Sequence, residues 1–303
     1  MSDISFDGRV AIVTGAGNGL GRTYALDLAA RGAHVLVNDL GGSRDGTGGA
    51  TTAAQQVVDE IQAAGGSAVA SYDSVATAEG GNAIVQAAVE AFGTVDVVIN
   101  NAGILRDKSF TNMAQEDIRA VLDVHLLGAF NVTQPAFRIM KEKGYGRLVF
   151  TSSNAGVFGN FGQANYGAAK TGLIGLSNVL AIEGLKYGIT SNVVLPVART
   201  RLTEELLGPL ADTLKAELIT PLVVFLASEA CQVTREVYSA LAGRYAQVFT
   251  AVTEGWLCPA ETVPSAEDVQ DHLEQIRDRQ TFEVPSSSQD ELGLLLPRLL
   301  ARG

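Results

Sequence analysis

The sequence is poor in the residues that build disulfide frameworks and metal sites. Among its 303 residues are only two cysteines, Cys231 and Cys258, and three histidines. Two cysteines are too few for a disulfide framework, and His34, His125 and His272 lack metal-ligand spacing to a cysteine or to one another. The composition therefore argues against a disulfide-dense secreted domain, predicts no metal site and favours a reducing compartment, the cytoplasm.

Positive charge and long apolar runs are scarce as well. The chain has 22 lysines and arginines against 33 aspartates and glutamates, a formal net charge of −11. Such a chain offers no basic field to phosphates, so we expect no nucleic-acid partner. No apolar run approaches the roughly 18 residues of a membrane span. The start, "MSDISFDGRVAIVTGAG", does not read as a signal peptide, and the end, "LLARG", is no peroxisomal address of the Ser-Lys-Leu type.

What the sequence does contain is an alternation of short β-branched runs and longer helical patterns. Its 47% hydrophobic residues suffice for one large core. The strand candidates are 10–15, 33–39, 68–73, 95–100, 147–153, 190–196 and 236–243; the helix candidates lie near 20–31, 50–64, 77–92, 115–143 and 163–187. Strand, helix and strand repeated in this way predict an α/β fold with a doubly wound parallel sheet of about seven strands, which binds ligands at the carboxyl ends of its strands.

Two stretches depart from this alternation. "LGGSRDGTGGA" (40–50) is too rich in glycine for a helix or strand, and we expect it near the binding edge of the sheet. From about residue 260 the chain turns polar: "SAEDVQDHLEQIRDRQ" predicts an exposed helix and "VPSSSQDELG" a loop, before "LLLPRLL" (294–300). We expect one α/β domain over 1–250 and an extension over 251–303. Its leucines should be buried, either on the chain's own core or across a subunit interface beside the ligand cleft.

The segment "TGAGNGLG" (14–21), between the first strand and the first helix, predicts a phosphate cradle. Glycines at 15, 19 and 21 permit a tight turn, and the helix N-terminus behind them favours a pyrophosphate. Asp39 ends the second strand, where a carboxylate can accept hydrogen bonds from both hydroxyls of an adenosine ribose and repels a 2′-phosphate. Residue 18 is an uncharged asparagine, although Arg44 is not far away. The pattern indicates a dinucleotide site that prefers NAD to NADP.

"NYGAAK" (165–170) places one phenol and one amine four residues apart, on one face of a helix. A free tyrosine is a poor base at neutral pH, and we expect the Lys170 ammonium and the positive charge of an oxidised nicotinamide to lower the pKa of Tyr166. Lys170 should also hold the nicotinamide ribose. Ser153, at the end of the fifth strand candidate, can hydrogen-bond a substrate oxygen or simply cap the next helix. These residues suit the proton transfer that accompanies hydride transfer.

In this order and spacing, "TGAGNGLG", "NNAG" (100–103), Ser153, "YGAAK" and "NVVLP" resemble the short-chain dehydrogenase/reductase family over about residues 6–245. The resemblance implies a Rossmann fold, a nicotinamide cofactor, a substrate lid near 200–217 and a homo-oligomer, dimer or tetramer. The catalytic residues it implies are Ser153, Tyr166, Lys170 and, at the position of a relay residue, His125. The cofactor residues are Gly15, Asn18, Gly19, Leu20, Gly21, Asp39, Asp73, Ser74, Asn101, Ala102, Gly103, Tyr166, Lys170, Pro196 and Thr200.

The chain departs from the family pattern at two positions near the site. His125, in "DVHLLGAF", stands where the family usually has an asparagine that holds a water in a proton relay. It can hold the same water through a ring nitrogen, or it can be a packed helix histidine; the sequence leaves both readings open. The family's Pro-Gly after the sixth strand reads Pro196-Val197 here, which bears on the nicotinamide contact assigned to Thr200.

A narrower resemblance points to a substrate class. "VLVNDLGG", "SYDSV", "NNAGILRDKSF" and "GNFGQANYGAAKTGLIGL" are similar to the (3R)-hydroxyacyl-CoA dehydrogenase unit of multifunctional β-oxidation enzymes, also described as a 17β-hydroxysteroid dehydrogenase. The expected substrate is thus a 3-hydroxyacyl-CoA, and a bulky or steroid acyl group is one option for its acyl chain. Arg106, Lys108, Arg199 and Arg201 are candidate cations for the CoA, or plain surface charges. The alternatives are a dehydrogenase of free steroid or xenobiotic alcohols, and a non-catalytic NAD-binding scaffold.

Overall fold

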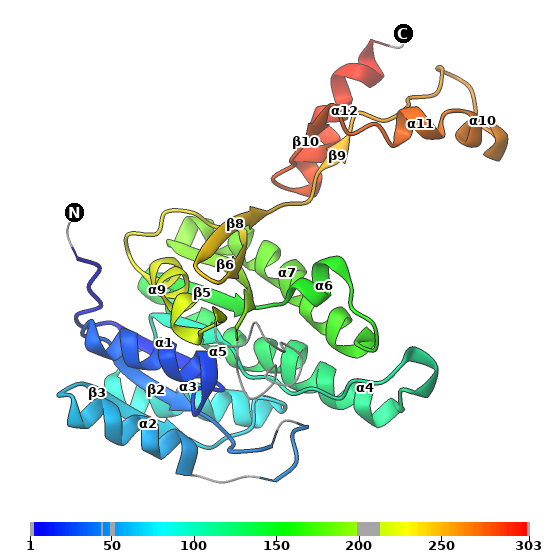
Figure 1. The fold of residues 1–303 in the computed structure, drawn as a ribbon. Coiled ribbons are helices and arrows are strands. Elements are labelled where there is room, and N and C mark those ends of the chain that lie inside the picture. Colours follow the sequence, from blue (N-terminus) through cyan, green and yellow to red (C-terminus); the bar gives the residue numbers. More distant parts are fainter. Residues whose placement is uncertain (1–2, 44, 49–51, 199–212, 302–303) are drawn as a thin grey trace. The chain divides into compact units, whose positions relative to one another are not determined.

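Among the described residues, eight strands form one sheet with helices on both of its faces (Figure 1), and two short strands near the C-terminus form a separate sheet. The computed structural model describes residues 3–43, 45–48, 52–198 and 213–301. The strands of the sheet are β1 (Val10–Thr14), β2 (His34–Asn38), β3 (Ser67–Ser71), β4 (Val97–Asn100), β5 (Gly146–Thr151), β6 (Ile189–Val197), β7 (Val237–Leu241) and β8 (Arg244–Val248). Neighbouring strands from β1 to β7 pair in parallel. The predicted doubly wound parallel sheet is confirmed.

The strand order is β3-β2-β1-β4-β5-β6-β7-β8, so the order reverses between β1 and β4. In sheets of this kind ligands bind at the carboxyl ends of the strands beside such a reversal. β1 and β5 are buried along their whole length, as expected for strands covered on both faces. The eighth strand, β8, lies at the edge and is largely exposed, and a two-residue turn at Ala242 and Gly243, both with positive φ, joins it to β7.

Two groups of helices cover the sheet. The helices described within residues 1–247 are α1 (Gly19–Ala30), α2 (Thr52–Ala63), α3 (Ala78–Phe92), α4 (Gln115–Leu122), α5 (Gly128–Lys143), α6 (Asn154–Phe158), α7 (Ala164–Gly184) and α9 (Thr220–Ala227). Single turns form η1 (Phe110–Asn112), η2 (Asp123–Leu127), η3 (Leu185–Tyr187) and η5 (Ala216–Leu218). α1 packs on α2 and α9, α3 packs on α5, and α7 packs on α4. The helix predicted over 115–143 is interrupted by the π-helical turn η2, which places His125 in the interior.

The chain divides into two compact units, residues 1–247 and 248–303. The second contains β9 (Val252–Thr253), β10 (Phe282–Glu283), α10 (Ala266–Asp271), α11 (Leu273–Ile276) and α12 (Ser288–Leu300). None of its described residues is buried, and Leu292, Leu296 and Leu300 are exposed. The exposed helix predicted near 265–280 is present as α10 and α11. The loop predicted over 284–293 is wrong from Ser288 on, because the Ser287 hydroxyl accepts a hydrogen bond from Asp290 N and caps α12.

Candidate active site

A cavity of about 410 Å³ lies at the carboxyl ends of the central strands. Most of the predicted site residues line it: Gly15, Asn18, Gly19, Leu20, Asp39, Asp73, Ser74, Asn101, Ala102, Gly103, His125, Ser153, Tyr166, Lys170 and Pro196. Gly21 is buried in α1, where it supports the glycine turn. Thr200, Arg199, Arg201 and most of the predicted lid lie outside the described residues. One cavity thus brings the two predicted groups together, while the roles assigned to its residues stay predictions.

The glycine turn after β1 is held tightly against the end of β4. A Cβ atom on Gly15, whose φ is +63°, would lie 2.7 Å from Ala102 Cα, and one on Gly21 would lie 2.3 Å from Gly15 O. The Asn101 side chain donates hydrogen bonds to Thr14 O and Gly15 O, at 3.1 and 3.0 Å. Any side chain at these two glycines would push the turn away from the strand end. The predicted close backbone approach is therefore present here.

The Asp39 carboxylate joins the glycine turn to the loop after β2. It accepts hydrogen bonds from Gly17 N at 2.9 Å and Gly41 N at 2.7 Å, one on each oxygen. Each oxygen keeps a further lone pair, and the residue lines the cavity. Nearby, Asn18 is the N-cap residue of α1, but its side chain makes no capping hydrogen bond. The backbone N–H groups of the first turn therefore remain available to an anion. These features fit the adenosine and pyrophosphate of a dinucleotide.

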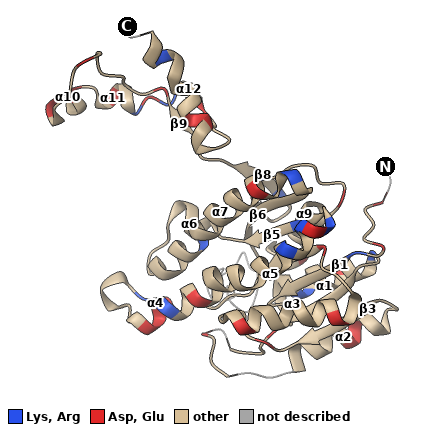
Figure 2. Ribbon diagram, turned by 180° about the vertical axis from the view of Figure 1, so that it is seen from behind, with Lys and Arg blue, Asp and Glu red and all other residues tan. Residues whose placement is uncertain are grey.

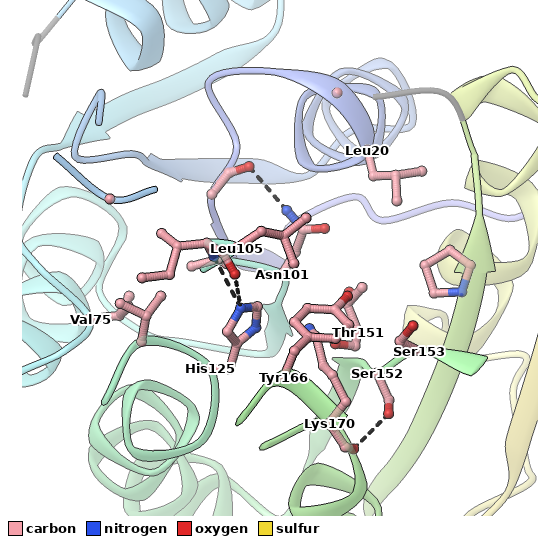
Figure 3. A pocket seen from close by; sticks show the side chains of 18 of the residues that line it. Leu20, Val75, Asn101, Leu105, His125, Thr151, Ser152, Ser153, Tyr166 and Lys170 are labelled. Atoms are coloured by element: carbon pink, nitrogen blue, oxygen red, sulfur yellow. Dashed lines mark hydrogen bonds between the residues drawn. The ribbon is translucent and has the colours of Figure 1, made fainter. Parts of the chain in front are cut away.

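Ser153, Tyr166 and Lys170 meet at the other end of the cavity, where β5 ends beside α7 (Figure 3). Ser153 accepts a hydrogen bond from Ala155 N at 3.2 Å and so caps α6. It also lines the cavity, and its hydrogen bond to a substrate oxygen stays a prediction. Lys170 is 3% exposed and donates to Thr151 O at 2.5 Å. Its Nζ lies 5.5 Å from the centre of the Tyr166 ring.

Burial governs the protonation of this pair. It raises the pKa of Tyr166 to about 12, against a hydrogen bond with Ser153 that lowers it, and the charge of Asp107 adds to the rise. Burial also lowers the pKa of Lys170 to about 7. Lys170 is not among the causes of the Tyr166 shift: its amine donates to the Thr151 carbonyl, and desolvation dominates. The expected lowering, which also involves the charge of the oxidised nicotinamide, stays a prediction.

His125 packs under Tyr166, with its ring edge-on and the ring centres 5.2 Å apart. Its Nε2 lies 3.0 Å from Ile104 N and 2.8 Å from Ile104 O, and a Cβ atom on Gly103 would lie 2.4 Å from the ring. Burial, and next the charge of Lys170, keep the pKa of His125 well below its usual value, against the hydrogen bond with Ile104. The ring is therefore neutral, and its buried Nδ1 has no partner among the described residues.

A small cavity of about 10 Å³ lies between His125 and Lys170. Thr14 and Asn100 also line it. A void of this size holds about one water molecule, provided that polar groups face it. His125 is thus a packed helix histidine through its contact with Ile104. The cavity beside it has space for the water that His125 would hold in the alternative interpretation.

The glycine-rich segment 40–48 lies at the rim of the cavity, as expected, with Leu40, Gly42, Ser43 and Gly46 in its wall. Arg106 connects this segment to α4: its side chain donates a hydrogen bond to Asp45 O at 2.9 Å and forms an ion pair with Asp117 of α4 at 3.3 Å. On α4, acidic and basic residues lie side by side (Figure 2). Arg106 is thus engaged within the fold rather than available to a CoA phosphate, while Lys108 is exposed.

Several residues of the site were not predicted from the sequence. Ser152 donates to Lys170 O at 2.6 Å, and Gln163, Asn165 and Asp107 connect the start of α7 to the segment after β4. Spacing along the chain gave no signal for these contacts, because the partners come from separate segments. The stretch "GQANY" itself was a signal, since the two amides that precede Tyr166 need hydrogen-bond partners when buried.

The sequence comparisons agree with this geometry. The family described as short chain dehydrogenase matches residues 9–207. Peroxisomal multifunctional enzyme type 2 of Mus musculus is 47% identical over 294 residues, which cover 96% of this chain and 40% of the mouse protein. A hydroxyacyl-CoA dehydrogenase of Mycobacterium tuberculosis is 41% identical over 242 residues, 74% of each chain. The chain thus spans well under half the length of the mouse relative.

The comparison with solved structures points the same way. Full-length peroxisomal multifunctional enzyme type 2 from Drosophila melanogaster superposes with a TM-score of 0.84 at 39% identity, over 98% of this chain and 50% of the fly chain. The similarity therefore extends beyond the sheet to nearly all of the chain. Both predicted resemblances are confirmed, and the chain belongs to the short-chain dehydrogenase family, as an oxidoreductase that resembles the dehydrogenase unit of multifunctional enzymes.

Proposed function

We propose that the chain is an NAD-dependent dehydrogenase that interconverts a secondary alcohol and a ketone, with a 3-hydroxyacyl-CoA as its substrate. The observation that carries this proposal is a single cavity lined both by the glycine turn with Asp39 and by Ser153, Tyr166 and Lys170. The name of the Mycobacterium relative, a hydroxyacyl-CoA dehydrogenase, supports the acyl-CoA class. The dehydrogenase activity resides in residues 1–250, and residues 251–303 are an extension.

Gly15, Asn18 and the first turn of α1 would hold the pyrophosphate, and Asp39 the adenosine ribose. A bound nicotinamide would supply the acceptor, or in reverse the donor, of the hydride at the substrate carbon. Titration of the chain with NAD and NADP tests the cofactor choice. We expect NAD to bind far more tightly, because Asp39 meets the 2′ position; equal affinities would contradict the role of Asp39 and point to Arg44 as a phosphate contact.

In the proposed mechanism Tyr166, as the phenolate, takes the proton of the substrate hydroxyl and becomes the neutral phenol, and Ser153 hydrogen-bonds the same oxygen. Lys170 stabilises the phenolate before this transfer and again when Tyr166 passes its proton on. A water held between His125 Nδ1 and Lys170 would connect the ammonium to the small cavity and carry the proton onward. In the reverse direction the protonated Tyr166 returns the proton to the ketone oxygen.

The test of this function is reduction of NAD with matched substrates. We expect turnover of (3R)-3-hydroxyacyl-CoA esters, with a far lower kcat/KM for free steroid and xenobiotic alcohols. A preference for the free alcohols would replace the acyl-CoA class with the second class of substrate. Tight NAD binding without turnover of any alcohol in either group would instead indicate a non-catalytic scaffold.

We further propose that the chain forms a homo-oligomer, dimer or tetramer, with α12 in a subunit contact beside the substrate cleft. The support is the apolar and exposed character of Leu292, Leu296 and Leu300 in a unit without buried residues among those described. Deleting residues 285–303 should change both the molecular mass in solution and the KM. If both stay unchanged, α12 has neither role.

We place the chain in the cytoplasm, on its low cysteine content. Among the described residues, no helix has the length and apolarity needed to cross a membrane. The word peroxisomal in the names of several relatives supports a competing location. Fractionation of cells that make the protein would decide between the two.

A further inference from the structure

A chain of polar side chains lies beside the catalytic tyrosine. The Asn160 side-chain N–H donates to Gln163 Oε1 at 2.9 Å, and Gln163 Nε2 donates to Asp107 Oδ2 at 2.9 Å. Gln163 is only 7% exposed, yet it lines the cavity together with Asn160 and Tyr166. The mechanism above uses none of these hydrogen bonds, so their purpose requires another explanation.

Asp107 fixes which end of the Gln163 amide faces which way. An ionised carboxylate only accepts hydrogen bonds, so Gln163 must turn its NH₂ group toward Asp107 and its oxygen toward Asn160. The second hydrogen on Gln163 Nε2 finds no acceptor among the described residues. An amide hydrogen that stays unpaired in a buried site costs free energy, which a ligand with a carbonyl oxygen can recover.

Gln163 stands one helical turn from the reacting group. It is the N-cap residue of α7, and Tyr166 follows three residues later, so the two side chains leave the helix on the same side. Two further contacts secure this end of α7 to the segment after β4: Lys108 N donates to Gly162 O at 2.9 Å, and Asn165 Nδ2 donates to Arg106 O at 3.1 Å. The donor is therefore held at a fixed place relative to Tyr166.

We propose that Gln163 is a specificity-determining residue, whose Nε2–H donates a hydrogen bond to the thioester carbonyl of a 3-hydroxyacyl substrate. This inference rests on the proposed function. In such a substrate the carbonyl carbon is separated from the reacting carbinol carbon by a single methylene, which gives an acceptor at a short, nearly constant distance from the oxygen that Tyr166 serves. Asp107 is a positioning residue that acts through Gln163.

The chemistry explains how such a site would discriminate. A pocket that hydrogen-bonds one substrate group rejects analogues without that group, because its own buried donor is then left unpaired. A secondary alcohol that has no carbonyl two carbons away would leave Gln163 unpaired and would react poorly. Selection would thus depend on the 1,3-relationship of hydroxyl and carbonyl rather than on the CoA moiety.

The test compares a 3-hydroxyacyl thioester of N-acetylcysteamine with the thioether in which a methylene replaces its carbonyl. For the parent enzyme we expect the thioester to have the higher kcat/KM. Gln163→Leu should lower kcat/KM for the thioester by roughly 10- to 100-fold, the loss of one buried hydrogen bond, and leave the thioether within about 2-fold. Asp107→Asn, whose amide no longer dictates the orientation of Gln163, should lower the ratio of the thioester to the thioether value, but less than Gln163→Leu does. The charge of Asp107 also raises the pKa of Tyr166, and its removal acts on both substrates alike, so the ratio is the quantity to compare.

A matched control is Gln86→Leu on the exposed face of α3, which should keep the parental ratio of the two substrates. Equal losses on both substrates in Gln163→Leu, with the parental substrate ratio kept in Asp107→Asn, would mean a merely structural role and would overturn the inference. Unchanged values on both would overturn it as well. A parent enzyme inactive on every hydroxyacyl thioester would overturn the proposed function and the inference with it, whereas an active parent with an unaltered ratio in the variants would remove the inference alone.

Discussion

The two ends of the cavity are built by different means. Beside β1 and β2 the backbone forms the site: glycines lie against neighbouring main-chain atoms, and the Asp39 carboxylate accepts hydrogen bonds from two backbone N–H groups. Beside β5 and α7 the site consists of buried side chains, Lys170 and His125 among them, whose properties depend on desolvation. We therefore expect changes at the first end to affect cofactor affinity, and changes at the second to affect proton transfer and its pH dependence.

Replacing Tyr166 with phenylalanine should have the largest effect. The change removes the hydroxyl that exchanges a proton with the substrate, and loss of a general acid or base costs about 10²- to 10⁴-fold in rate. Cofactor affinity should stay near the parental value, because the glycine turn and Asp39 are untouched. Steady-state kinetics and cofactor titration measure the two quantities. Tyr72→Phe, at an exposed tyrosine, is the control; near-normal turnover in Tyr166→Phe would remove this residue from the mechanism.

Gly21→Ala should instead lower cofactor affinity, the quantity that Tyr166→Phe is expected to leave unchanged. The added Cβ would lie 2.3 Å from Gly15 O, so the glycine turn must shift away from its place. We expect cofactor affinity to fall by about 10-fold or more, because displaced backbone N–H groups no longer face the pyrophosphate. Calorimetric titration with NAD measures the effect.

Gly175→Ala in α7 is a matched control for that change. A Cβ atom there meets nothing within 4 Å, and alanine favours a helix over glycine by about 0.5–1 kcal/mol. This control should therefore bind NAD normally and unfold at a slightly higher temperature. If both variants bind NAD equally well, the tight packing at Gly21 is not needed for the cofactor.

The two ends also differ in how far the sequence predicts them. Glycine positions and the acid after the second strand follow local backbone rules, so Gly15, Gly21 and Asp39 could be read directly. Ser153, Tyr166 and Lys170 followed from spacing. The contacts of Gln163 and Ser152 could not, because their partners are brought near only by the fold. The direction of the Tyr166 pKa shift was missed for the same reason: burial is a property of the whole tertiary structure.

A similar limit applies to the fold as a whole. The seven parallel strands were predicted because their apolar runs are those of a sheet covered on both faces. The eighth strand, "RYAQV", was missed because it is a largely exposed edge strand whose polar residues give no such signal. Helix α12 was taken for a loop over residues 288–293, because the Ser287 cap and these helical residues share the polar composition of loops.

His125→Asn tests the desolvated end through stability. The pKa of His125 is lowered in the folded state, so the unfolded chain binds more protons below about pH 6.5. The contribution of neutral His125 to the free energy of unfolding is therefore fully present above that pH. It is lost as the pH falls toward the pKa of the folded state, with a slope of up to about 1.4 kcal/mol per pH unit. The variant should lose less stability than the parent between about pH 7.5 and 5 in urea unfolding. Equal losses would show that His125 is not buried as a neutral ring.

The smallest effect is expected from Ser152→Ala. Ser152 is 1% exposed, and its hydroxyl donates to Lys170 O at 2.6 Å, while Lys170 Nζ donates to Thr151 O on the same strand end. The carbonyl also belongs to the α7 ladder, so it keeps a partner, and the loss should be about 0.5–1.5 kcal/mol of unfolding free energy. Because the hydroxyl ties the Lys170 backbone to β5, kcat should fall a few-fold while the affinity for NAD stays constant. Urea unfolding, kcat and NAD titration are the three measurements. A variant that binds NAD more weakly but keeps its kcat would show that this contact serves the cofactor end of the cavity. The proposed division between the two ends would then fail at Lys170.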